Sequence, residues 1–325
     1  RSAYEGQTFH TAMGDETLNI DELCQQLDTE DMIGFTESFV SDLEIGFSVV
    51  TEERLSWLPT IKTRNWKGIL CFGMGGSAAG GDFLARLADA NGSKPLVVHR
   101  TYDLPSWWTN DWLILATSHS GNTEETVAAT ESALKQGATV IVIATGGILA
   151  GLCELYDDCH LIPSTGGQPP RTAFGHLFSR QLALMETIGI LPSQSQEERE
   201  AMMVRLEYAC QSNDFRKPSG APLLDLAMAL MDHPIALLGS NDMQPALVRF
   251  KNQLNENAGR FGRIGIVPEM NHNEIVAWGG LSDDADPERA NQATLFLTWD
   301  GMHQRVRRRI DWMIEHTPTD YAWKI

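Results

Sequence analysis

Two stretches rich in glycine and hydroxyl residues stand where a buried strand is expected to end and a helix to begin. The first, GMGGSAAGG, covers residues 73–81, and the second, ATSHSGNTEET, covers residues 116–126. Glycines permit close approach of a ligand, and a helix N-terminus offers unpaired backbone N–H groups to an anion. One hydroxyl there would serve as a helix N-cap. Ser118, Ser120 and Thr123 together exceed that need and favour an oxyanion ligand such as a phosphate monoester.

The first loop alone leaves other interpretations open. Gly73-x-Gly75-x-x-Ala78 fits a dinucleotide fingerprint weakly. That alternative requires an acid at the end of the next strand, where the sequence has His99 and Arg100, so only an NADP variant survives. A glycine-rich turn without a ligand is the remaining alternative. A dehydrogenase has no use for the second loop, so the pair of loops favours phosphate binding.

The elements that must position these loops alternate along the chain. Continuous apolar runs between helical patterns are typical of parallel strands buried on both faces. The sequence predicts an α/β fold with two three-layer αβα sandwich domains, preceded by a helical arm of one or two helices within residues 20–51. Strands are expected at 68–72, 94–99, 111–117, 138–144, 159–164, 234–240, 263–268 and 293–299, and helices at 78–88, 124–136, 173–190, 197–210, 222–231, 244–258 and 302–315.

The chain length also favours two domains. It has 325 residues, and a domain takes roughly 150 residues. Composition changes abruptly in LPSQSQEERE, residues 191–200. We therefore expect an arm at 1–45, a first domain with the hydroxyl-rich loops at 46–192, and a second domain at 193–325. Residues 1–19 show little periodicity and enter none of these predicted helices or strands.

Charge and apolar content limit the partners. With 25 Lys and Arg against 43 Asp and Glu, the formal charge is -18, which is opposite to the basic surface that nucleic-acid binding needs. A small anion is still compatible, because helix N-termini bind phosphate locally. No apolar run reaches the ~20 residues of a membrane span, and no signal-peptide pattern opens the chain. Neither a nucleic-acid nor a membrane partner is expected.

The five cysteines are expected to be reduced thiols of a cytoplasmic protein. Their number is odd, and several lie inside apolar runs such as ILCF. Cys153 and Cys159 are isolated from other Cys and His pairs, apart from His160 beside the second. This spacing does not fit a zinc framework, so no metal is expected.

Five stretches together resemble one family. GMGGSAAGG followed by SHSGNTEET is similar to the sugar isomerase (SIS) family, whose members hold sugar phosphates with a S-x-S-G-N-T loop. QPPRTAF (168–174), NQLNENAGR (252–260) and EMNHNEI (269–275) narrow the resemblance to the bifunctional phosphoglucose/phosphomannose isomerase branch. The resemblance extends over nearly the whole chain.

The resemblance implies an aldose-ketose isomerase without a cofactor. Its reaction interconverts glucose 6-phosphate with fructose 6-phosphate through a cis-enediol, with mannose 6-phosphate as the expected second substrate. It would serve glycolysis and gluconeogenesis. Two alternatives stay open: a non-catalytic regulator that binds a sugar phosphate, and an isomerase of another sugar phosphate. A regulator needs the phosphate loops alone.

The resemblance also implies a phosphate site in the first domain. Gly76 and Ser77 of the first loop, with Ser118, Ser120 and Thr123 of the second, would bind the substrate phosphate. His119 departs from the residue more common in the family at this position. The change is tolerable, because amides and hydroxyls bind the phosphate.

Four further residues acquire catalytic roles by resemblance. Arg171 would lie over the C1 and C2 oxygens and stabilise the enediolate, and Glu256 would move the proton between C2 and C1. His272, 16 positions after Glu256, would open the sugar ring from the partner subunit of a homodimer. Lys324 is the candidate for the family's C-terminal lysine. Their presence together favours catalysis over the regulator.

Without the resemblance, each of these residues has an ordinary interpretation. Glu256 lies opposite the apolar stripe of its predicted helix, as on a solvated charged face. His272 between asparagines is typical of a hydrogen-bonding cap. Arg171 alone could form a surface ion pair.

Overall fold

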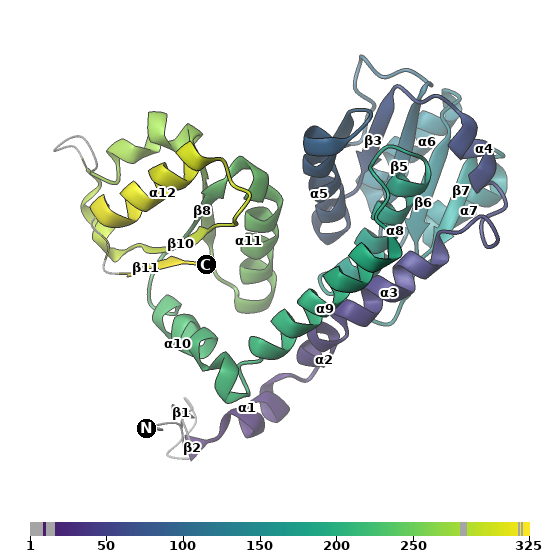
Figure 1. The fold of residues 1–325 in the computed structure, drawn as a ribbon. Coiled ribbons are helices and arrows are strands. Elements are labelled where there is room, and N and C mark those ends of the chain that lie inside the picture. The colour runs from purple at the N-terminus through teal and green to yellow at the C-terminus, as the bar shows by residue number, and fades with distance from the viewer. Residues whose placement is uncertain (1–8, 11–16, 280–284, 318, 320) are drawn as a thin grey trace.

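The computed structural model describes residues 9–10, 17–279, 285–317, 319 and 321–325. The chain opens with a small antiparallel pair of strands and continues as a helical arm (Figure 1). The arm contains three helices, where one or two were expected. Asn19 and Glu22 form a reciprocal capping box at the first of them. The elements are β1 (Phe9–His10), β2 (Thr17–Leu18), α1 (Ile20–Leu27), α2 (Met32–Glu37) and α3 (Phe39–Val49).

The first sheet has five parallel strands in the order β4-β3-β5-β6-β7. All residues of the apolar runs GILCF and VIVIA are buried, because helices cover both faces of the sheet. All five predicted strands are confirmed, with ends shifted by up to two residues. They are β3 (Gly68–Phe72), β4 (Leu96–His99), β5 (Trp112–Thr117), β6 (Val140–Ala144) and β7 (Cys159–Pro163).

Helices form two layers on this sheet. One buried core joins it to α4, α5 and α8, and a second core joins its other face to α6 and α7. The helix predicted at 78–88 begins three residues earlier, so that Ser77 lies in its first turn; the weak helix formers Gly75 and Gly76 obscured this start. Two short helices, α4 and α7, were not predicted. The bounds are α4 (Leu58–Thr63), α5 (Gly75–Asn91), α6 (Glu124–Lys135), α7 (Gly147–Leu155) and α8 (Phe174–Thr187).

The second sheet has four parallel strands in the order β11-β10-β8-β9. Side chains of α11 pack on one face and side chains of α12 pack on the other, which makes a second three-layer sandwich. Its edge strand β11 was not predicted. The elements are α9 (Gln196–Ser212), α10 (Ala221–Leu230), β8 (Ile235–Ser240), α11 (Gln244–Ala258), β9 (Gly262–Val267), β10 (Ala293–Leu297), α12 (Gln304–His316) and β11 (Tyr321–Lys324), with short 3-10 turns η1 (Pro218–Gly220), η2 (Asn241–Met243), η3 (Glu269–His272), η4 (Glu274–Val276) and η5 (Pro287–Asn291).

The arm packs along the first domain rather than standing apart. Helices α3, α8 and α9 run side by side in Figure 1. Val40 and Leu43 of α3 form a small core with Met203 of α9, and buried Asp42 Oδ1 of α3 lies 3.2 Å from His176 Nε2 of α8. Helix α3 continues past residue 45, and α9 packs against it. The predicted boundaries, at residue 45 between the arm and the first domain and at residue 192 between the two domains, stay predictions.

Membrane-spanning helices, metal-binding groups and disulfide bonds would each bear on the partners and chemistry of the chain. None of the described helices is both long and apolar enough to cross a bilayer. The described residues also include no group of three or more His, Cys, Asp or Glu side chains placed to hold a metal ion. All five cysteines are free thiols.

Candidate active site

The two hydroxyl-rich loops lie together at the carboxyl edge of the first sheet. β3 and β5 are adjacent and parallel, and the chain leaves β3 for α5 and β5 for α6. The next strand in sequence after β3, β4, lies on the other side of β3. Loops that diverge in this way form the crevice in which α/β folds bind ligands. The topology thus places both predicted phosphate loops at one site.

One hydrogen bond joins the two loops, and two others lie within the second loop. The backbone N–H of His119 donates to Ser77 Oγ at 3.1 Å. Ser118 Oγ lies 2.8 Å from Thr123 Oγ1 and also accepts from the Gly121 N–H at 3.1 Å. Thr123 is the N-cap of α6 but makes no side-chain cap bond, so its hydroxyl is used within the loop. The arrangement brings Ser77, Ser118 and Thr123 together.

Ser120 lies at the exposed tip of the second loop. Its Oγ accepts a hydrogen bond from the Asn122 N–H at 3.3 Å. Gly76 lies on the other side of the site, where a Cβ atom would be 3.1 Å from the carbonyl oxygen of Pro170. The first loop therefore approaches the backbone of the segment that carries Arg171.

His119 is a buried part of the loop. The residue is 8% exposed overall, and its Nε2 lies 3.0 Å from the Gln168 carbonyl oxygen. Burial lowers the pKa of His119, so the imidazole is neutral at neutral pH. The histidine at position 119, which is not the residue more common in the family, is therefore a packed side chain that links the second loop to the segment 168–171.

Gly121 holds the second loop against the start of α7. Its φ is +72°, and a Cβ atom would lie 1.8 Å from the Gly146 carbonyl oxygen. The Leu149 N–H donates to the Gly121 carbonyl at 3.0 Å, and the Ile148 N–H donates to Asn122 Oδ1 at 3.0 Å. The loop can take this shape only when position 121 lacks a side chain.

Gly121→Ala is therefore expected to displace the loop and abolish binding of fructose 6-phosphate, measured by calorimetric titration. Gly137→Ala is the matched control, because Gly137 has a similar φ of +78° and a Cβ atom there would meet nothing within 4 Å. Both variants incur the left-handed cost of roughly 1–2 kcal/mol, but the control adds no clash. Equal binding by both variants would contradict this account of the loop.

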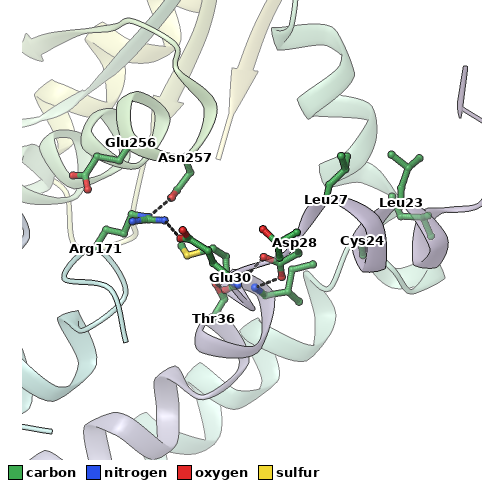
Figure 2. Close-up of a pocket in the computed structure, with 13 residues that line it drawn as sticks. Leu23, Cys24, Leu27, Asp28, Glu30, Thr36, Arg171, Glu256 and Asn257 are labelled. Atoms are coloured by element: carbon green, nitrogen blue, oxygen red, sulfur yellow. Dashed lines mark hydrogen bonds and ion pairs between the residues drawn. The ribbon is translucent and has the colours of Figure 1, made fainter. Parts of the chain in front are cut away.

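Arg171 and Glu256 line one cavity of about 570 Å³ between the two domains and the arm (Figure 2). Arg171 lies before α8 in the first domain, and Glu256 lies near the C-terminal end of α11. The helical pattern predicted an exposed Glu256, and the structure exposes it at this cavity. The wall contributed by the arm consists of Ile20, Leu23, Cys24, Leu27, Asp28, Thr29, Glu30, Met32, Ile33 and Thr36.

The Arg171 guanidinium is held from two sides. Its Nε donates to Asn257 Oδ1 at 2.9 Å, and one terminal nitrogen pairs with Glu30 Oε2 at 2.9 Å. Figure 2 shows Asn257 directed at Arg171, whereas the Glu256 carboxylate points away from Asn257 and the arm. Nothing in the arm sequence singled out Glu30, because its contact spans 141 positions of the chain.

A second arginine shapes the electrostatics beside Glu256. The Arg249 guanidinium carbon lies 4.1 Å from the centre of the Phe174 ring. Burial lowers the pKa of Arg249 to about 10, opposed by the attraction of Glu256. Exposed Glu256 therefore lies within electrostatic range of a partly buried cation on its own helix.

His272 lies away from this cavity. Glu256 precedes the start of β9, whereas His272 follows its end in η3. The six residues of β9 span roughly 20 Å. Met270 and Ile275, which flank His272, pack in the core on the α12 side of the sheet, while α11 covers the opposite face. The spacing of 16 residues therefore does not bring the two side chains together within one chain.

Lys324 also lies on the α12 side. Trp323 packs in the core with α11, so the alternation of a strand directs Lys324 to the other face. Its Nζ pairs with Asp311 Oδ1 of α12 at 2.7 Å. Neither Lys324 nor His272 is among the residues that line the described cavity with Arg171 and Glu256.

The two parallel-sheet sandwiches and their loops define a protein built of SIS domains. Residues 62–186 match the SIS domain family, and residues 221–320 match the bacterial phospho-glucose isomerase C-terminal SIS domain. The solved tagatose-6-phosphate ketose/aldose isomerase of Escherichia coli has a similar fold, with a TM-score of 0.64 at 17% identity over 89% of this chain and 80% of that one. This likeness supports the fold alone.

Sequence relatives narrow the class. The bifunctional phosphoglucose/phosphomannose isomerase of Aquifex aeolicus is 29% identical over 249 residues, which cover 76% of this chain and 71% of the relative. The enzyme of the same name from Caldicellulosiruptor bescii is 31% identical over 66% of this chain and 64% of its own length. The chain belongs to the SIS family, on the branch of the bifunctional phosphoglucose/phosphomannose isomerases.

Proposed function

We propose that this protein is an aldose-ketose isomerase that interconverts glucose 6-phosphate, and also mannose 6-phosphate, with fructose 6-phosphate through a cis-enediol. One observation carries the proposal: an arginine and a glutamate from different domains line a single cavity, in a chain of the phosphoglucose/phosphomannose isomerase branch. The dinucleotide alternative has less support, because Arg100 forms an ion pair with Asp82 at 2.5 Å.

The phosphate would be bound at the edge of the first sheet. The N-terminus of α5 would present the backbone N–H groups of Gly75 and Gly76 to an anion. The Ser77 N–H donates to the Met74 carbonyl at 3.1 Å, so Ser77 would contribute through its hydroxyl. Ser118, Ser120 and Thr123 supply hydroxyls from the adjacent loop. Binding there would anchor one end of the open-chain sugar, and the rest would extend past Gly76 toward Arg171.

Glu256 would move the proton in the isomerisation itself. Its carboxylate removes the proton from C2 of the aldose, and the electron pair left behind forms the C1–C2 double bond of the enediol as the C1 carbonyl becomes an oxyanion. A proton passes from the O2 hydroxyl to the O1 oxyanion. The O2 electron pair then forms the C2–O2 carbonyl of the ketose, while the electron pair of the C1–C2 double bond takes the proton back from the same carboxyl at C1. Arg171 would stabilise the negative charge on the oxygens, as a preorganised cation does most effectively in a shielded site.

His272 would open the sugar ring, and we place it in the active site of the partner in a homodimer. The separation of His272 from Glu256 along and across β9 supports this placement. Lys324 lies on the same side of the second sheet as His272. We propose that it acts beside His272, at the end of the substrate where the ring opens. A cytoplasmic location and a place in glycolysis and gluconeogenesis complete the proposal.

The purified protein is expected to convert fructose 6-phosphate to glucose 6-phosphate in the presence of EDTA. A coupled dehydrogenase assay measures the glucose 6-phosphate that forms. Mannose 6-phosphate is tested in parallel and is expected to be a second substrate. Strong binding of these sugar phosphates without turnover would instead favour the regulator. Turnover of a different phosphosugar alone would assign the protein to another isomerase activity.

A further inference from the structure

Three hydrogen bonds form a closed ring between the two domains. Arg171 Nε donates to Asn257 Oδ1 at 2.9 Å, and Asn257 Nδ2 donates to Gln253 Oε1 at 2.6 Å. Gln253 Nε2 then donates to the Arg171 carbonyl oxygen at 2.9 Å. The series thus returns to the residue from which it started. We call these three residues the Arg171 clamp.

The clamp fixes Arg171 at both its backbone and its side chain. A hydrogen bond to the carbonyl alone would leave the long side chain free to rotate, and a bond to Nε alone would leave the backbone segment unrestrained. Because Nε–H is part of a cation, its bond to the Asn257 amide oxygen is charge-assisted and stronger than a neutral one. The direction of the guanidinium is therefore set by α11 together with the Glu30 ion pair from the arm.

The helix supplies these contacts from a single row. Arg249, Gln253 and Asn257 follow one another at intervals of four, so their side chains leave the same face of α11. Arg249 donates to the Arg171 carbonyl oxygen as well, at 3.4 Å. Glu256 is adjacent to the last member of this row. The helix that carries the proposed base therefore also holds the proposed oxyanion-binding cation.

The clamp leaves part of the guanidinium for a ligand. Nε is used by Asn257 and one terminal nitrogen by Glu30. The other terminal nitrogen makes no hydrogen bond or ion pair with the described residues. Arg171 is 25% exposed at its side chain and lines the cavity, so this nitrogen can reach a bound oxyanion while the clamp stays intact.

We propose that Gln253 and Asn257 are positioning residues that hold the Arg171 guanidinium in register with Glu256. The proposal rests on the isomerase function proposed above. Neither amide touches the reacting atoms, and both act through Arg171. Loss of the clamp therefore lowers the rate of isomerisation, with little effect on phosphate binding at the first sheet.

The test is a double-mutant cycle with Asn257→Ala and Arg171→Ala. Asn257→Ala is expected to lower kcat roughly 10- to 100-fold, the scale of a slightly misplaced catalytic group, with KM changed much less. In the Arg171→Ala background, Asn257→Ala is expected to cause no further loss, because the group it positions is already absent. Gln253→Ala keeps the Asn257–Arg171 bond and is expected to give a smaller loss.

Conservative and control variants separate positioning from folding. Asn257→Asp retains an oxygen that accepts from Arg171 Nε and is expected to recover most of the kcat lost in Asn257→Ala. Asn255→Ala is the matched control, because Asn255 Nδ2 bonds to the Arg260 carbonyl at 2.7 Å within the second domain; its kcat is expected to be unchanged. Melting temperatures are recorded for every variant.

The outcomes distinguish this proposal from the proposed function. An inactive wild-type protein would reject the isomerase assignment itself. An active wild type together with normal kcat in Asn257→Ala, or losses that multiply in the double variant, would overturn the positioning role. A loss of activity that follows the melting temperature and is not rescued by Asn257→Asp would assign the amides a merely structural role.

Discussion

Glu256→Gln is expected to abolish turnover of fructose 6-phosphate and to leave its binding affinity unchanged. The amide has nearly the shape of the carboxylate but cannot accept the proton that must leave C1 of this ketose, and general bases contribute on the order of 10²- to 10⁴-fold to a rate. The proposed phosphate contacts at Ser77 and Ser118 lie in the other domain and are not altered. Initial rates and calorimetric titration measure the two effects separately.

Solvent exchange makes this test specific to proton transfer. The wild-type protein in deuterium oxide is expected to incorporate deuterium at C2 of glucose 6-phosphate, and Glu256→Gln is expected to incorporate none. Glu131→Gln is the control, since Glu131 forms an exposed ion pair with Lys135 on α6, and it is expected to behave as the wild type. Full activity in Glu256→Gln would refute the assignment of the base.

Mixing two inactive proteins is expected to restore activity if His272 acts across subunits. Glu256→Gln and His272→Asn each lack one group in every site. A mixed dimer pairs an intact Glu256 of one chain with an intact His272 of the other in one of its two sites. In an equal random mixture half of the dimers are mixed, so about a quarter of all sites would be complete.

The structure gives this complementation its physical basis. β9 and the thickness of the second sheet separate Glu256 from His272 within a chain, so a complete site would need the histidine from another copy. Each variant alone, at the same total concentration and after the same unfolding and refolding, is the control. Absence of recovery in verified mixed dimers, or full activity in a monomeric wild type, would contradict the partner's contribution.

The regular elements of both sheets could be predicted because their signals are local. Buried parallel strands appear as apolar runs such as VIVIA, and amphipathic spacing is visible in α11. Within the two sandwiches three elements lacked such signals, and the two short strands β1 and β2 before the arm lacked them as well. α4 and α7 are short, and β11 carries two aromatic residues and a lysine, which gain their strand structure from pairing with β10.

The site could be predicted only in part, for a similar reason. Motifs identified Arg171 and Glu256 by resemblance, and the structure places both at one cavity. The contribution of Glu30 depends on how the arm folds back over 141 positions, which no local pattern encodes. Gln253 and Asn257 lie within the motif NQLNENAGR (252–260), but the motif does not show that they contact Arg171. That contact depends on how the two domains pack against each other.

The Arg171 clamp has a consequence for how such chains can be recombined. A chimera that takes its first sandwich from one relative and its second from another would preserve both hydrophobic cores. Its residue 171 would come from one parent, however, and the residues at 253 and 257 that bind it would come from the other. Residue 171 and residues 253 and 257 of the proposed site are therefore expected to be inherited together. Gene-shuffling experiments should recover active chimeras mainly when all three residues come from the same parent.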